Sequence, residues 1–99
     1  MNSDNNRTEK EVETALVYAV KNAGGKALKF ISPGYDGMPD RIVLFPKGRI
    51  AFVEVKAPGK QPRPLQLSRH RMLRRLGFRV YVIDDIKQIG EIVDEIRTA

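Results

Sequence analysis

The spacing of apolar residues alternates along this chain between a helical and a strand-like period, and this alternation limits the possible folds. Over residues 8–23 apolar side chains recur every three or four positions, which is typical of an amphipathic helix, and the glycine pair at 24–25 favours its end. Three short strand-like runs follow, at 27–31, 40–45 and 50–56. The last two flank residues 46–49, whose Pro-Lys-Gly-Arg sequence predicts a hairpin.

The rest of the chain predicts a helix, a strand and a second helix. Pro64 suits the first turn of a helix, where its missing N–H is not needed, and Gly77 favours the end of that helix. Four apolar side chains of this helix are expected to point inward: Leu65, Met72, Leu73 and Leu76. A β-branched and aromatic strand follows at 78–83, and a final helix begins at Ile86. The predicted fold class is therefore α/β, with the order αβββαβ plus a C-terminal helix and a mixed central sheet flanked by helices.

The length and composition exclude several classes of protein. A chain of 99 residues is expected to form one domain over 1–99, with residues 1–6 disordered. The absence of Cys and the single His exclude a disulfide framework and a Cys- or His-rich zinc site. No apolar run approaches the length of a membrane span, and the N-terminus lacks the apolar stretch of a signal peptide. We expect a cytoplasmic protein without a membrane partner.

Positive charge is concentrated in the middle of the chain. The net charge of +6 divides into −1 for residues 1–25, +10 for residues 26–79 and −3 for residues 80–99. Such a basic segment predicts a surface that binds a phosphate backbone, although an unevenly charged solvated surface is the simpler alternative. Three acids lie inside the segment, Asp36, Asp40 and Glu54. Because they repel phosphate, each needs another role.

Two of these acids are placed to share a cation. Side chains alternate along a strand, so Glu54 and Lys56 are expected on one face and Val55 on the other. A hairpin centred on Gly48 would set Asp40 opposite Lys56 and diagonal to Glu54, which requires an odd number of turn residues or a bulge. Two carboxylates at that separation suit Mg²⁺ or Mn²⁺, and a nearby lysine can orient water or stabilise developing charge. This combination predicts phosphodiester hydrolysis.

Simpler explanations exist for each motif separately. Glu-Val-Lys occurs in ordinary strands as an exposed ion pair, and Pro-Asp is a common turn dipeptide. The predicted first helix offers a third carboxylate, from either Glu9 or Glu13, which are four residues apart and so share a helix face.

The sequence Gly37-Met38-Pro39-Asp40 followed by Glu54-Val55-Lys56 resembles the signature of the PD-(D/E)XK nucleases, and in particular of their VRR-NUC branch. The resemblance covers nearly the whole chain and implies a restriction-endonuclease-like core. It implies that Asp40 and Glu54 bind the metal, that Lys56 assists the water and that the Val55 carbonyl is a further ligand. Glu9 fits the VRR-NUC helix pattern best, whereas Glu13 fits a resolvase-like pattern. Gln66 resembles the helix glutamine that supports the active site in this family.

Further residues are expected to contact DNA. Lys29 and Ser32 flank the expected cleft, and Tyr35 lies on a loop where it could stack on a base or pack against its own loop. Arg41 is expected to point to the opposite face and to pack or pair there, and His70 to be a surface or packing residue rather than a ligand. The other candidate phosphate contacts are Lys60, Arg63, Arg69, Arg71, Arg74 and Arg75.

The resemblance implies an Mg²⁺- or Mn²⁺-dependent DNA endonuclease of bacterial or phage type that acts as a homodimer, as Holliday-junction resolvases do. A chain this short has little surface for reading base sequence, so selectivity for branched or junction DNA is expected, with no small-molecule cofactor. The alternatives are a monomeric flap or single-strand nuclease, and a nucleic-acid-binding module that does not cut.

Overall fold

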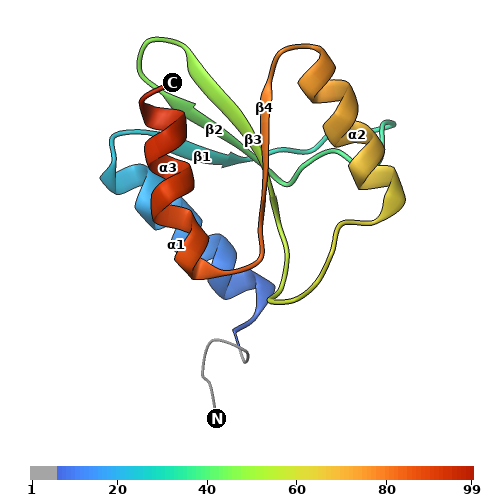
Figure 1. The fold of residues 1–99 in the computed structure, drawn as a ribbon, viewed down its shortest axis with the longest axis horizontal. Coiled ribbons are helices and arrows are strands. Elements are labelled where there is room, and N and C mark those ends of the chain that lie inside the picture. Colours follow the sequence, from blue (N-terminus) through green and yellow to red (C-terminus); the bar gives the residue numbers. More distant parts are fainter. Residues whose placement is uncertain (1–6) are drawn as a thin grey trace.

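The computed structural model describes residues 7–99, and the disorder expected for residues 1–6 lies outside them. Four strands form one sheet in the order β1-β2-β3-β4 (Figure 1). Strand β2 pairs antiparallel with both β1 and β3, and β4 pairs parallel with β3. The strands are β1 (Lys26–Lys29), β2 (Arg41–Phe45), β3 (Arg49–Val55) and β4 (Arg79–Ile83). The helices are α1 (Glu9–Asn22), α2 (Pro64–Arg75), the short 3₁₀ helix η2 (Ile86–Gln88) and α3 (Ile89–Arg97). The predicted order of elements and the mixed sheet are confirmed.

Helices α1 and α3 cover one face of the sheet, and α2 lies on the other (Figure 1). A capping box starts α1: the Glu11 amide donates to Thr8 Oγ1, and the Thr8 amide donates to the Glu11 carboxylate, each at 3.1 Å. Val12, Leu16 and Val20 are fully buried, as their helical spacing predicts. They pack in a core with residues of all four strands and α3. This core holds α1 against the sheet.

The face of the sheet under α2 holds a smaller core. Leu73 of α2 packs with Phe52 and Val80, and the Phe52 ring makes edge-to-face contacts at 5.6 Å with Phe30 and Phe78. The expected inward direction of Leu65 and Leu76 is wrong, because they are 45% and 66% exposed. Helix α2 instead turns Gln66, His70 and Leu73 toward the sheet. These residues lie four and three positions apart, so they form one stripe along the helix.

The β2–β3 hairpin corrects the predicted register. Arg41 pairs with Val53 and Phe45 pairs with Arg49, so the three-residue turn is centred on Lys47 rather than on Gly48. Lys47 and Gly48 both have positive φ, at 70° and 72°, which closes this odd-numbered turn. Continuing the register by one residue sets Asp40 opposite Glu54, not opposite Lys56. The two carboxylates are therefore brought closer than the sequence predicted.

No helix within residues 7–99 has both the length and the apolar character required to cross a membrane.

Candidate active site

Glu54 is a buried carboxylate in the middle of the molecule. It lies near the end of the inner strand β3, and its side chain is 1% exposed. Strand alternation places Glu54 and Val55 on opposite faces of the sheet, as predicted. Val55 enters the core under α1 and α3, and Glu54 faces α2. A carboxylate in such a position is costly unless other groups hydrogen-bond to it.

Helix α2 supplies hydrogen bonds to both oxygens of Glu54. Gln66 Nε2 donates to Glu54 Oε2 at 3.1 Å, and His70 Nε2 lies 3.2 Å from Glu54 Oε1. The Gln66 side chain is itself fixed, because its Oε1 accepts from the Arg63 amide at 2.8 Å. Lys56 Nζ lies 4.0 Å from Glu54 Oε2 and is largely buried. The structure therefore brings three predicted site residues, Glu54, Lys56 and Gln66, into one cluster.

His70 belongs to this cluster, which the sequence did not indicate. The expectation of a packing residue is met in that His70 is 1% exposed, but its ring also contacts Glu54. Burial, and then the positive charges of Arg74 and Lys56, lower the pKa of His70, so the ring is neutral at pH 7. A neutral ring that donates from Nε2 leaves Nδ1 as an acceptor, and Nδ1 has no partner within residues 7–99. The sequence signal that could have indicated this contact is the four-residue spacing of Gln66 and His70, which places both side chains on one face of α2.

Asp40 completes the cluster from the end of β2. Its Oδ2 accepts from the Val55 amide at 2.9 Å, which fixes the carboxylate across the end of β3. Burial raises the pKa of Glu54 to about 8, and the hydrogen bond and charge of Asp40 add to this rise. The positive charge of Lys56 opposes it. Two carboxyl groups are thus held so close that one retains its proton near neutral pH.

This donor set fits a hard divalent cation. A cation between Asp40 and Glu54 would replace the retained proton and relieve their repulsion. Within residues 7–99 no group of three or more His, Asp or Glu side chains is arranged to hold a metal. Mg²⁺ commonly takes one or two carboxylates and completes its octahedron with water and substrate phosphate, so the pair is sufficient for it. The Val55 carbonyl stays a predicted ligand.

The two candidate carboxylates of α1 have different surroundings. Glu13 Oε2 accepts from Arg41 Nε at 3.0 Å, on the face of the sheet away from α2. Arg41 also donates to the Ala27 carbonyl at 3.1 Å, which confirms its predicted orientation and pairing. Glu9 is exposed at the start of α1, and its charge contributes to the raised pKa of Glu54. Glu13 is therefore engaged with Arg41, and Glu9 stays a predicted ligand from α1.

The loop before Asp40 is held against α2. Arg69 places its guanidinium carbon 3.8 Å from the centre of the Tyr35 ring and donates from Nε to the Asp36 carbonyl at 2.7 Å. Gly37 has φ +89°, and a Cβ there would lie 2.8 Å from Leu65 Cγ. Tyr35 therefore packs against α2 rather than only against its own loop, while it stays 43% exposed.

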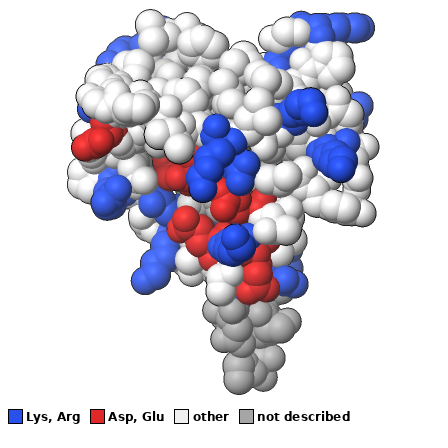
Figure 2. All heavy atoms as spheres, turned by 180° about the vertical axis from the view of Figure 1, so that it is seen from behind, with Lys and Arg blue, Asp and Glu red and all other residues white. Residues whose placement is uncertain are grey.

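The other predicted DNA contacts differ in accessibility. Arg74 donates to the Val80 carbonyl at 2.8 Å, so part of its bonding capacity is used inside the fold. Ser32 is half-buried, and its carbonyl accepts from the Tyr35 amide. The remaining side chains are exposed: Lys29, Lys60, Arg63, Arg71 and Arg75. Figure 2 shows acidic side chains gathered in the middle of one face, with Lys and Arg side chains around them.

Comparison with known proteins gives consistent results. Residues 4–84 match the family model described as "VRR-NUC domain". The chain is 51% identical over 76 residues to "Putative nuclease p44" of Acyrthosiphon pisum secondary endosymbiont phage 1, covering 77% of this chain and 82% of that protein. A solved structure described as "VRR_NUC domain" superposes with a TM-score of 0.81 at 31% identity, covering 89% of this chain and 97% of that one.

Proposed function

The chain belongs to the VRR-NUC family of nucleases, and from this premise we propose that it is a metal-dependent DNA endonuclease. The observation that carries the proposal is the pair of carboxyl groups of Asp40 and Glu54, held together with Lys56 beside them. Such a set is what phosphodiester hydrolysis requires, since the reaction needs an activated water and stabilisation of developing negative charge.

Asp40 and Glu54 would hold Mg²⁺ or Mn²⁺, with the Val55 carbonyl and Glu9 as further candidates. When bound, such an ion lowers the pKa of water and neutralises phosphate charge. Lys56 provides a positive charge, with its Nζ 4.0 Å from Glu54 Oε2, and this charge orients the attacking water. Gln66 and His70 hold the two oxygens of Glu54, so that its direction does not change when substrate arrives.

We propose branched DNA as the substrate and a homodimer as the active form. Two copies related by a two-fold axis present two sites to two strands of a junction. The face of the sheet under α2 supports a second copy, because α2 leaves its outer part uncovered. Two apolar side chains of this part are exposed, Leu28 on β1 and Leu44 on β2. We propose the cytoplasm of a bacterial or phage-infected cell as the location.

The decisive experiment incubates a labelled four-way junction with the protein in Mg²⁺, in Mn²⁺ and in EDTA. We expect products only with a metal. The Lys56→Ala variant is expected to bind the junction and to lose cleavage, because its charge acts in the chemical step. The matched control is Lys47→Ala, which removes a lysine from the hairpin turn at the other end of β3.

Two results would contradict this function. Cleavage that survives the combined change Asp40→Asn and Glu54→Gln would show that the cluster is not the site. Binding with no metal-dependent product between pH 6 and pH 9 would favour the non-cutting nucleic-acid-binding module. Light scattering after size-exclusion chromatography separates the dimer from the monomeric flap or single-strand nuclease.

A further inference from the structure

A groove follows the outer side of α1, away from α2. Two adjoining cavities of about 420 and 250 Å³ share Val17 and Lys21 in their lining. The larger cavity begins at Lys10, near the start of α1, and the smaller one reaches Lys26 on the edge strand β1. The groove therefore extends from the first turn of α1 to the open edge of the sheet.

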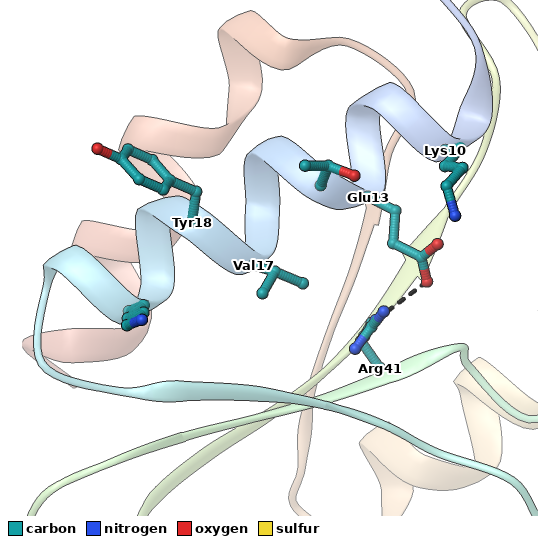
Figure 3. Close-up of a pocket in the computed structure, with 7 residues that line it drawn as sticks. Lys10, Glu13, Val17, Tyr18 and Arg41 are labelled. Carbon is teal, nitrogen blue, oxygen red and sulfur yellow. Dashed lines mark hydrogen bonds and ion pairs between the residues drawn. The ribbon is translucent and has the colours of Figure 1, made fainter.

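The groove carries a positive charge that the fold does not neutralise. Lys10, Lys21 and Lys26 are exposed along it, and the structure pairs none of the three with a carboxylate within residues 7–99. Its one acid, Glu13, is bound by Arg41, and Figure 3 shows the two side chains pointing toward one another. A chain of phosphates is the complement of such a groove.

An aromatic side chain stands beside these lysines. Tyr18 is 67% exposed on the outer side of α1, further from the sheet than Val17 (Figure 3). Exposed aromatic rings combined with a positively charged groove are the usual means of binding single-stranded nucleic acid, because unpaired bases can stack on the ring. Bases in a duplex are enclosed by their neighbours and cannot do so.

The length of the groove suits a short single strand. Lys21 lies eleven positions after Lys10, which corresponds to about 16 Å of helix. This length matches on the order of four stacked nucleotides at about 3.4 Å each.

We propose that this groove binds a single-stranded segment of the DNA substrate. The proposal rests on the proposed function for the identity of its ligand and extends it by naming a feature of that ligand, an unpaired segment carried by the branched DNA. Lys10, Lys21 and Lys26 contact the phosphates, and Tyr18 stacks on a base.

The test is fluorescence anisotropy in EDTA with two labelled duplexes, one blunt and one with a five-nucleotide single-stranded tail. The wild-type protein is expected to prefer the tailed duplex. Lys21→Ala is expected to reduce this preference and to lower the salt slope for tail binding by about 0.7. Tyr18→Ala is expected to weaken tail binding at least fivefold, since one base-stacking contact contributes about 1–3 kcal/mol, whereas Tyr18→Phe retains the ring and the affinity.

Lys47→Ala is the matched control, because it removes one exposed lysine that lines neither cavity. The proposal is overturned if Lys21→Ala behaves like Lys47→Ala, if the wild-type protein shows no preference for the tail, or if Tyr18→Ala binds the tail as Tyr18→Phe does. It is also overturned if Tyr18→Ala changes the mass measured by light scattering, since the groove would then be an interface between copies. A tail preference without any metal-dependent cleavage would support the groove and contradict the nuclease function, so the two failures are distinguishable.

Discussion

Glu54 has the most costly environment of the residues in the proposed site. Its carboxyl group is buried, lies against Asp40 and receives hydrogen bonds from α2. The pKa of Glu54 is therefore raised to about 8, above its ordinary value of 4.5. A carboxyl with a raised pKa binds its proton more tightly in the folded than in the unfolded state. The fold is favoured while that proton is present.

We predict that the free energy of unfolding of the cation-free protein falls as pH rises. The contribution of Glu54 is fully present below about pH 4.5 and is lost as pH rises through about 8, which amounts to about 2–4 kcal/mol. Urea denaturation in EDTA between pH 5 and pH 9 measures it. The variant Glu54→Gln should lack this component, and an equal pH slope in both proteins would show that Glu54 is not the cause. Added Mg²⁺ should restore stability most strongly at the upper end of the range.

His70 gives a second prediction at this scale. His70→Phe keeps a ring in the buried position and removes the hydrogen bond to Glu54, so the carboxylate is no longer held from that side. We expect about tenfold weaker Mn²⁺ binding by calorimetry, the usual effect of losing a group that orients a ligand. His70→Gln can still donate a hydrogen bond and should retain more of the affinity. Equal Mn²⁺ affinity in the wild-type protein and in His70→Phe would contradict this orienting role.

At the scale of elements, α2 connects the catalytic cluster to the loop that precedes Asp40. One side of the helix holds Glu54 through Gln66 and His70, and another side holds the loop through Arg69. The sequence predicted the helix and its start at Pro64, but the side it predicted to face the sheet was wrong at Leu65 and Leu76. Buried apolar residues are the usual guide to that side, and here two polar residues are buried because Glu54 needs donors.

The contact between this loop and α2 predicts a difference between two glycines. Gly37→Ala combines a positive φ with a Cβ 2.8 Å from Leu65 Cγ, whereas Gly34→Ala at φ +77° meets nothing within 4 Å. Both should lose about 1 kcal/mol or more of unfolding free energy from backbone strain, and Gly37→Ala should lose more. Urea denaturation of the two variants compares them. Equal losses would mean that the loop moves away from α2 without cost.

For the whole molecule, the uncovered part of the sheet leads to a prediction about assembly. Leu44 lies on the inner strand β2, on the face shared with α2, and it is 36% exposed. Leu44→Lys should convert a dimer to a monomer in light scattering, because the charge would be buried against the second copy. Leu67→Lys is the control, since Leu67 is similarly exposed on the outer side of α2. A dimer that tolerates both changes would place the interface elsewhere.

The sequence alone determined the order of the elements, the opposite faces of Glu54 and Val55, and the position of the β2–β3 hairpin. These features depend on neighbouring residues, since alternation and helical period are local properties of the backbone. Only the tertiary structure decided that Asp40 lies opposite Glu54, that Glu13 pairs with Arg41, and that His70 contacts Glu54. Each of these depends on how segments distant in sequence pack, and the buried charge of Glu54 determines which partners must meet there.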